Sequence, residues 1–269
     1  MKYSRCTAYL FVILFLSINN SFTQKKDPFD LTLTKEAILI TSGAAAGVTA
    51  LSILLNMDQL NIDEINSLNP LDVNEFDRSA IGPVLDDHLG DALLFSSYLM
   101  PLSFLANENA FNDFGSLAIM YGEVLLINAS INGIVKGITK RVRPFAYDKQ
   151  SPLNEKATVN AKLSFYSGHV SITAANSFFT ASVLNEYLDD NTTKTLIWTA
   201  AFLYPAIVGF SRINTHWHFP TDVIVGYIVG AAIGYLIPLV HKSDDEININ
   251  SNSPAGYLHK PLIGFKVNL

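Results

Sequence analysis

Six stretches of this chain contain almost no charged residue, and each is long enough to form a helix. They cover residues 37–57, 92–107, 115–135, 168–185, 195–210 and 223–240. Their spacing favours helices, and few alternating, strand-like runs lie between them. We therefore predict an all-α protein, a bundle of six helices, without an internal repeat or a linker that would mark a second domain.

The composition suits a helical bundle that contacts a membrane. Hydrophobic residues make up 49% of the 269 residues and charged residues only 16%, a low fraction for a water-soluble protein. Residues 37–57 and 223–240 have the length of membrane spans, whereas residues 115–135 include Glu123 and residues 168–185 are rich in Ser, Thr and Asn. A buried helical core would read similarly. The net charge of −6 argues against nucleic acid as a partner.

The N-terminus has the build of a secretory signal peptide. A short basic start precedes an apolar run at residues 8–18, and small residues follow before Gln24. Because this run is short for a membrane span, we expect residues 1–23 to be a signal peptide, with an uncleaved anchor as the alternative. The one cysteine, Cys6, precedes the run, so a processed chain would have no disulfide or thiol chemistry.

The rest of the chain divides into three parts. Residues 24–88 hold the first apolar stretch and an acidic connector, residues 89–241 form the helical core, and residues 242–269 form a polar tail. Three short polar blocks within the core carry nearly all the side chains that are suited to chemistry. Each block by itself has a purely structural interpretation.

The first block is KGITKRVRP, in which Lys136 and Arg143 lie seven residues apart. On one helix this spacing is two turns, so both cations would point the same way, and Pro144 would end the helix there. Two cations that converge at a helix end suit an oxyanion such as phosphate. Basic residues at a helix C-terminus often only complement the helix dipole, so this block alone is weak evidence.

The second block is YSGH, which opens the fourth apolar stretch. Ser167 and Gly168 at a helix start would expose backbone N–H groups to an anion, and Gly168 would let the backbone come close to a ligand. His169 in the same turn could donate a proton to a leaving group. A helix cap with a packed histidine explains the same residues.

The third block is SRINTHWHFPTD. Pro220 fits the first turn of the last helix, with His218 just before it and Asp222 inside its first turn. A carboxylate on one ring nitrogen fixes the histidine tautomer and leaves the other nitrogen as a nucleophile or base. Arg212 adds a third cation. His216 and His218 also form an H-x-H pair, but no further cluster has ligand spacing, so we expect no metal site.

Together the blocks supply three cations, a helix N-terminus and two histidines, which is what metal-free phosphoryl transfer to histidine needs. The pattern K-x6-RP, SGH and SR-x5-H-x3-D resembles that of the type 2 phosphatidic acid phosphatase and vanadium haloperoxidase superfamily. It is present as Lys136 with Arg143-Pro144, Ser167-Gly168-His169, and Ser211-Arg212 with His218 and Asp222. The resemblance spans about residues 90–240 and departs from the family at Tyr166, where proline is usual; that proline shapes a loop.

The resemblance implies a role for each matched residue. His218 would be the nucleophile that takes the phosphoryl group, and Asp222 would hold it. His169 would protonate the leaving group and then activate water. The phosphate oxygens would be bound by Lys136, Arg143, Ser167, the Gly168 amide and Arg212. The active site would lie at one end of the bundle, and no cofactor is expected.

The function implied is a metal-independent phosphatase that acts on phosphate monoesters or pyrophosphates through a phosphohistidine. The apolar bundle favours lipid phosphates such as phosphatidic acid or an isoprenyl pyrophosphate. One alternative is a soluble, secreted acid phosphatase of broad specificity for small phosphate esters. Another is a vanadate-dependent haloperoxidase, although members of that branch tend to have longer chains. A third is a non-catalytic binding protein, although every catalytic position is filled here. The oligomeric state is not indicated.

We expect a location in the cell envelope, with the site facing the periplasm or exterior. The acidic connector at residues 58–91 fits an exported location, because cytoplasmic loops tend to be rich in Lys and Arg. However, three apolar stretches precede Lys136, so three spans after an exported residue 24 would place the site inside. Either these stretches do not all span, or the N-terminal segment is not a simple export signal, or the bundle is secreted and soluble.

Overall fold

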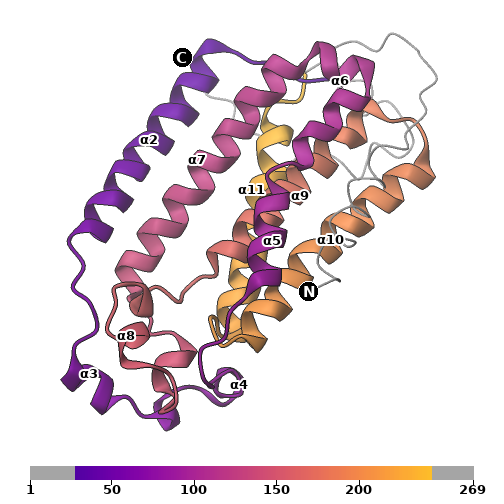
Figure 1. Cartoon of the computed structure of the whole chain (residues 1–269). Helices are drawn as coiled ribbons and strands as arrows, with labels where there is room; N and C mark the ends of the chain where they lie inside the picture. The colour runs from indigo at the N-terminus through magenta and orange to yellow at the C-terminus, as the bar shows by residue number, and fades with distance from the viewer. Residues whose placement is uncertain (1–27, 244–269) are drawn as a thin grey trace.

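The computed structural model describes residues 28–243, and this part of the chain is an all-α bundle (Figure 1). The predicted six-helix bundle is confirmed. Its long helices are α2 (Leu33–Leu55), α5 (His88–Ser97, continued by the 3-10 helix η2, Met100–Ala106), α7 (Phe114–Thr139), α9 (Gly168–Tyr187), α10 (Asn191–Asn214) and α11 (Pro220–Val240). The predicted signal peptide and most of the predicted polar tail lie outside the described residues.

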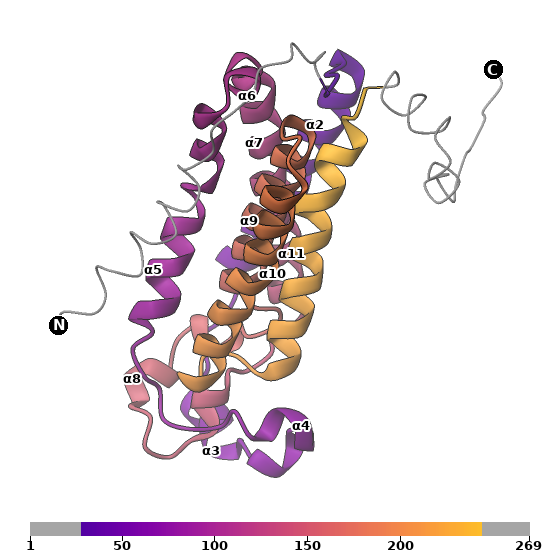
Figure 2. The same cartoon turned by 90° about the vertical axis from the view of Figure 1, so that its right-hand side faces the viewer.

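Short helices cluster at one end of the bundle, where α7 ends and α9 and α11 begin (Figures 1 and 2). The acidic connector contributes α3 (Ile62–Ser67), η1 (Pro70–Asp72) and α4 (Glu75–Arg78). The segment between the first two polar blocks contributes η3 (Pro144–Tyr147), α8 (Leu153–Lys156) and η4 (Asn160–Lys162). This segment therefore holds one short α-helix and two 3-10 helices. Helix α6 (Glu108–Asn112) lies at the opposite end.

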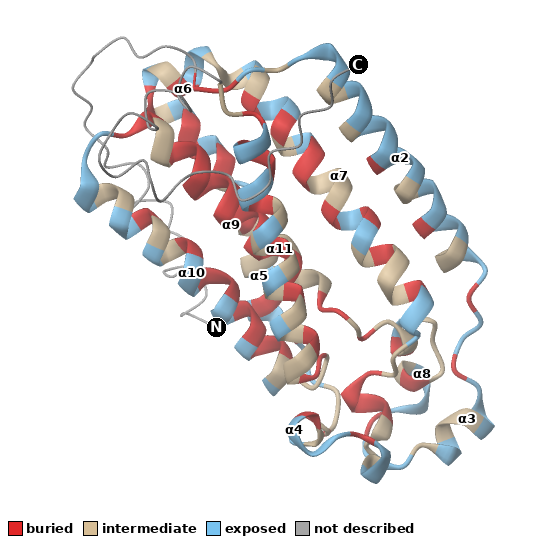
Figure 3. Cartoon of the chain, turned by 180° about the vertical axis from the view of Figure 1, so that it is seen from behind, coloured by how far each residue is buried: buried red, intermediate tan, exposed pale blue. Residues whose placement is uncertain are grey.

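Helix α9 is the centre of the bundle, and nearly every residue after its first turn is buried (Figure 3). This explains its Ser, Thr and Asn content, because these side chains bond within the bundle: Ser171 Oγ donates to Asn128 Oδ1 at 2.6 Å. Helix α11 packs against α9 through Gly226, Gly230 and Gly234, one per turn. A Cβ atom at Gly230 would lie 2.0 Å from the carbonyl oxygen of Ser171, so only glycine permits this approach.

Five of the helical segments are long and apolar enough to cross a membrane: Leu33–Leu55, His88–Ala106, Phe114–Tyr147, Asn191–Asn214 and Pro220–Val240. Their outer faces carry apolar side chains that the bundle leaves exposed, among them Val48 at 70%, Phe210 at 70% and Ile228 at 60%. Such faces are stable in contact with lipid and costly in water. The chain is therefore a membrane protein with five candidate transmembrane helices. Helix α9 is not one of the five, and it packs against four of them.

Candidate active site

All three polar blocks lie at the end of the bundle that carries the short helices. The first block begins in the last turn of α7, the second opens α9, and the third joins α10 to α11. The chain reverses direction through α9 and α10, so the third block returns to the end where the first two lie. The sequence predicted this convergence at one end of the bundle.

The first block reaches the site by a route that differs from the prediction. Helix α7 ends at Thr139, and Lys140 takes a left-handed conformation with φ of 45°. Arg143 is extended, as expected for a residue before proline, with φ of −72° and ψ of 154°. The prediction that Lys136 and Arg143 point the same way from one helix was therefore wrong. Lys136 lies in the last turn of α7, and its ammonium group donates to the carbonyl oxygen of Leu163.

Arg143 positions its guanidinium group against His218. Its Nε donates to the carbonyl oxygen of Asn160 at 2.8 Å and its Nη2 to Asn160 Oδ1 at 2.9 Å. Its Nη1 lies 2.9 Å from the carbonyl oxygen of Trp217 and 3.0 Å from His218 Nε2. A guanidinium group can only donate, so His218 Nε2 accepts through its lone pair and carries no proton.

The environment of His218 favours its neutral form. The residue is 1% exposed. Burial, together with the positive charges of Arg143, Lys136 and Arg212, holds the pKa of its imidazole well below the usual value of 6.5. A neutral imidazole keeps the Nε2 lone pair available at physiological pH.

Asp222 lies beside the other ring nitrogen, but its strongest contacts are elsewhere. Its Oδ2 is 3.5 Å from His218 Nδ1, an ion-pair distance that is too long for a hydrogen bond. Oδ2 accepts from Ser164 Oγ at 2.5 Å and from the Phe219 backbone N–H at 2.9 Å, and Oδ1 accepts from Arg141 at 2.5 Å. Asp222 is thus fixed by three donors and faces the histidine from a rigid position.

The second block begins α9 as predicted. Ser167 is the N-cap residue, Gly168 is the first helical residue, and His169 follows. The Ser167 backbone N–H donates to the Asp222 carbonyl oxygen at 3.0 Å, which ties the second block to the third. A Cβ atom at Gly168 would lie 3.2 Å from Asn132 Oδ1, so the backbone there is closely packed.

Arg212 is held by carboxylates that the sequence analysis did not select. Its Nη1 donates to Asp87 Oδ2 at 3.0 Å and lies 3.5 Å from Asp91 Oδ1. Asp91 Oδ1 also lies 2.9 Å from His169 Nε2. The indole ring of Trp217 makes cation–π contacts with two cations, 5.1 Å from Arg143 and 5.0 Å from Arg212.

A second group of residues that the sequence analysis did not select holds Asp222 and the start of α11 in place. Arg141 bonds to Asp222 and, at 2.7 Å, to Asp77 in α4, and Asp77 accepts from Thr221 at 2.6 Å and 2.9 Å. The acidic connector thus docks on the N-terminus of α11. Its run of carboxylates was visible in the sequence, but only the fold shows that Asp77 is buried against Arg141.

Three buried donors in the site have no hydrogen-bond partner among the described residues. They are Ser167 Oγ, Nε of Arg212 and Nδ1 of His218, which faces Asp222 at 3.5 Å. Leaving a buried donor unpaired is costly, and an oxyanion that accepted from Ser167 and Arg212 would remove that cost for these two.

The two histidines of the H-x-H pair have different partners. His216 Nδ1 donates to the carbonyl oxygen of Ala80 at 2.9 Å, and the ring sits against Gly82, whereas His218 faces Arg143. Among residues 28–243, neither histidine belongs to a cluster of three potential metal ligands.

Comparison with known proteins identifies the class of this site. Residues 117–245 match the sequence model of the PAP2 superfamily, and this match includes all three polar blocks. This part of the chain is therefore similar to the PAP2 superfamily.

Three known proteins are similar to this chain. A PA-phosphatase-related family protein of Dictyostelium discoideum is 26% identical over 140 residues, which are 50% of this chain and 51% of that protein. Phospholipid phosphatase 1 of Mus musculus is 33% identical over 89 residues, which are 32% of this chain and 31% of that protein. The chain therefore spans about half of the first relative and a third of the second. The crystal structure of a transmembrane PAP2-type phosphatidylglycerolphosphate phosphatase from Bacillus subtilis matches with a TM-score of 0.43 and 21% identity, over 91% of this chain and 98% of that one.

Proposed function

We propose that this protein is a phosphatase that hydrolyses lipid phosphates without a metal ion, through a phosphohistidine on His218. The observation that carries the proposal is the contact at 3.0 Å between His218 Nε2 and Arg143, within a cluster of cations that includes Lys136 and Arg212. A neutral nucleophile beside buried cations is suited to attack a phosphate dianion, because the cations bind its oxygens and stabilise the charge of the transition state.

Each remaining group has a part in the same reaction. Ser167 and the Gly168 amide complete the phosphate-binding site with Lys136, Arg143 and Arg212. Ser167 Oγ and Arg212 Nε, which lack partners among the described residues, bind oxygens of the substrate. Nε2 of His218 bonds to phosphorus as the P–O bond to the leaving group breaks. His169 donates a proton to that leaving oxygen, then removes a proton from the water that hydrolyses the phosphohistidine. Asp222 stabilises the positive charge on the His218 ring.

Lipid substrates are favoured by where the site lies. The helices that carry it expose apolar faces suited to lipid, and the site is at their ends, level with the surface where a headgroup phosphate would lie. His169 and Asp91 are accessible from outside the site, with 26% and 51% of their side chains exposed. The five candidate membrane spans disfavour the soluble secreted phosphatase.

The first experiment measures phosphate release in the presence of chelator from phosphatidic acid, an isoprenyl pyrophosphate and a soluble aryl phosphate. Wild type is compared with His218→Asn and with His216→Asn, the same substitution two residues away. Asparagine tolerates the left-handed conformation of His216, where φ is 63°. We expect release by wild type and His216→Asn, a trapped acid-labile phosphoenzyme, and no turnover by His218→Asn. Release that survives in His218→Asn would exclude this nucleophile, and halide oxidation dependent on vanadate would favour the haloperoxidase.

We also propose that the site faces the exterior. The start of α2 and the site lie at opposite ends of the bundle (Figure 1). If α2, the α5–η2 segment and α7 all cross, an exterior site places residue 28 in the cytoplasm, so residues 1–23 would not then be a cleaved export signal.

Single cysteines test the orientation, because Cys6→Ser gives a cysteine-free background. Asn154→Cys, in α8 at the site end, and Asn191→Cys, at the opposite end, are matched exposed positions. An impermeant maleimide applied to intact cells should label Asn154→Cys and spare Asn191→Cys. The reverse labelling would place the site in the cytoplasm.

A further inference from the structure

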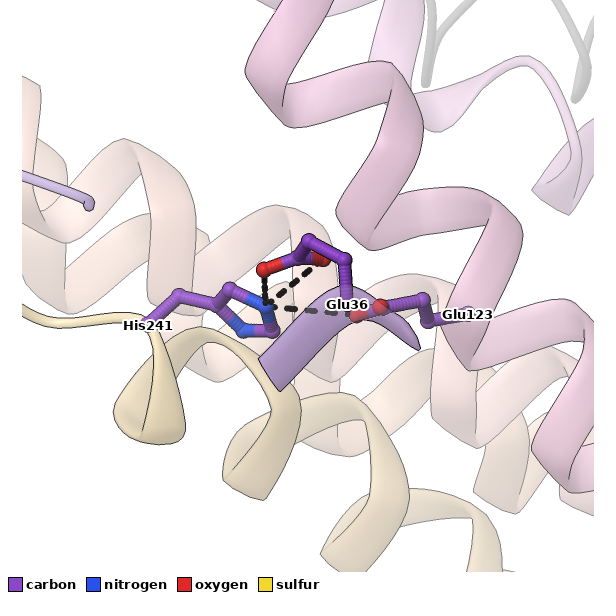
Figure 4. Close-up of side chains that lie close together, drawn as sticks. All are labelled: Glu36, Glu123 and His241. Carbon is purple, nitrogen blue, oxygen red and sulfur yellow. Dashed lines mark hydrogen bonds and ion pairs between the residues drawn. The ribbon is translucent and has the colours of Figure 1, made fainter. Parts of the chain in front are cut away.

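A second cluster of titratable side chains lies at the end of the bundle opposite the phosphate pocket. It consists of Glu36 in the first turn of α2, Glu123 in α7 and His241 after the last turn of α11 (Figure 4). Glu123 precedes Lys136 by thirteen residues on the same helix, which is about 20 Å at the α-helical rise. This cluster is therefore separate from the catalytic end.

The three side chains converge through their polar atoms. His241 Nε2 lies 3.1 Å and 3.3 Å from the two carboxylate oxygens of Glu36, and 3.4 Å from Glu123 Oε2. Two ligand atoms that are each about 2.1 Å from a tetrahedral ion lie roughly 3.4 Å apart. The spacing of these atoms is thus the spacing of metal ligands.

The tautomer of His241 leaves a lone pair directed at the carboxylates. Its Nδ1 lies 2.8 Å from the carbonyl oxygen of Ile237, which can only accept, so Nδ1 carries the proton. In the neutral ring Nε2 then has a free lone pair, and it faces Glu36 and Glu123. Histidine ligands of metals typically donate their other ring N–H to a carbonyl or carboxylate in this way.

Burial makes this arrangement of acceptors costly unless a cation joins it. The side chains of His241 and Glu123 are 0% and 1% exposed. Neither oxygen of Glu123 accepts a hydrogen bond from a donor in the described part of the chain. The neighbouring cation, Lys35, directs its ammonium group at two backbone carbonyl oxygens, of Asp30 at 3.0 Å and Val240 at 3.2 Å.

Charge decides which cation balances the site. A single proton on His241 would leave two carboxylates facing one positive charge in a buried place. A divalent ion bound to a neutral imidazole and two carboxylates is neutral overall, and mixed imidazole and carboxylate ligands suit Zn²⁺. Glu36, with a side chain that is 13% exposed, lies at the open side of the cluster.

We propose that Glu36, Glu123 and His241 bind a divalent transition-metal ion of the Zn²⁺ type, which fastens α2 to α7 and α11. The two ends of the described chain already meet at this place, because Phe29 pairs with Lys242 and the Asp30 N–H donates to the His241 carbonyl oxygen at 2.7 Å. The ion is structural. It takes no part in the proposed phosphoryl transfer at the opposite end.

The test uses the full chain in detergent, first stripped of metal with a chelator. Zn²⁺ is then titrated, with bound zinc measured by mass spectrometry and the melting temperature recorded. We expect one zinc per chain and a rise in Tm of roughly 5–10 °C at a hundredfold excess over Kd. X-ray absorption should report one imidazole nitrogen among oxygen ligands. Mg²⁺, which prefers oxygen ligands alone, should not replace Zn²⁺.

Variants assign the ligands. Glu123→Gln and His241→Gln should lose the bound zinc and the rise in Tm, whereas the exposed matched controls Glu75→Gln and His88→Gln should keep both. His218→Asn should also keep both, because the ion is not in the phosphate pocket. Folded wild type that binds no zinc saturably would overturn the proposal whatever the variants do. Equal binding by Glu123→Gln and His241→Gln, loss of zinc in His218→Asn, or an equal effect of Mg²⁺ would also overturn it.

Discussion

Asp91 Oδ1 lies 2.9 Å from His169 Nε2 and 3.5 Å from Nη1 of Arg212. One carboxylate on α5 therefore contacts both the proposed acid and one of the phosphate-binding cations, which come from α9 and α10. The Asp91 side chain is 51% exposed, so water screens its charge. Its main effect on His169 is therefore to fix the position of the ring. It is a positioning residue for the imidazole of His169.

Replacing Asp91 with asparagine should impair proton donation by His169. General acid catalysis contributes about a hundred- to ten-thousand-fold, so we expect Asp91→Asn to lower kcat by up to about a hundredfold on an alkyl phosphate. An aryl phosphate leaves without much protonation, so the loss there should be small. Steady-state kinetics on both substrates measure the difference.

Asp86→Asn is the matched control for that variant, since its carboxylate is 90% exposed and faces only His88 at 4.0 Å. It should behave as wild type. Equal losses on the alkyl and the aryl phosphate in Asp91→Asn would mean that Asp91 acts on the fold or on binding, and not through the leaving group.

Replacing Ser167 should weaken phosphate binding without lowering the free energy of unfolding. Its hydroxyl is buried, has no partner among the described residues and makes no cap hydrogen bond to α9. Ser167→Ala should therefore leave the free energy of unfolding unchanged or slightly higher. Binding of inorganic phosphate should weaken roughly 10- to 100-fold, because a hydrogen bond to a charged oxygen contributes about 1.5–3 kcal/mol.

Ser182 provides the comparison for this prediction. Its hydroxyl is also buried without a partner in the described chain, and it lies on the same helix fifteen residues away. Ser182→Ala should resemble Ser167→Ala in thermal unfolding and resemble wild type in phosphate binding by calorimetry. Weaker unfolding stability in Ser167→Ala alone would show that the hydroxyl is a structural cap.

The pH dependence should reflect the environment of His218. Burial and the neighbouring cations lower its pKa well below 6.5, so the imidazole gains a proton only at pH values well under that. The acid limb of kcat/KM should therefore lie below pH 6.5. The acid limb could also reflect ionisation of the substrate phosphate. Substrates whose phosphate groups differ in pKa distinguish the two causes, because a limb set by the enzyme stays at the same pH for all of them. An enzyme limb at or above 6.5 would contradict a neutral His218.

The sequence was sufficient for the helices and for where the blocks meet, since uncharged stretches and short motifs are local patterns. It was misleading about Lys136 and Arg143, because helical spacing cannot show that α7 ends at Thr139 and that Lys140 turns the chain. Both side chains nevertheless reach His218. The convergence depends on the turn and on the anchoring of Arg143 by Asn160, which is distant from the motif in sequence.

The supporting carboxylates were beyond the reach of pattern reasoning for a different reason. Asp77, Asp87 and Asp91 belong to the acidic connector, whose charge indicated only an exported location. Only the folded chain shows that Asp77 and Asp87 are buried and paired with Arg141 and Arg212. Glu123, by contrast, was visible as a charge in an apolar stretch, yet its two partners, Glu36 and His241, lie near opposite ends of the described sequence.

The glycines of α11 lead to a prediction about how the two halves of the site are aligned. Gly226, Gly230 and Gly234 bring α11 against α9, and these helices carry Asp222 and His169 at their starts. In Gly230→Ala the new Cβ would meet backbone, 2.0 Å from the carbonyl oxygen of Ser171, so the helices must separate. We expect a loss of stability of about 1–3 kcal/mol and, because a shift of about 1 Å can cost a hundredfold, a large fall in kcat.

Gly122→Ala is the matched substitution, because a Cβ there meets nothing within 4 Å on the same kind of helix interior. Alanine is the better helix former by about 1 kcal/mol, so this variant should be as stable as wild type or more so, with unchanged kcat. Denaturant unfolding and phosphate release on the two variants decide the matter. Full activity in Gly230→Ala would mean that the bundle tolerates a wider gap between α9 and α11, and that the alignment of His169 with His218 is set instead by the bond from Ser167 to the Asp222 carbonyl oxygen.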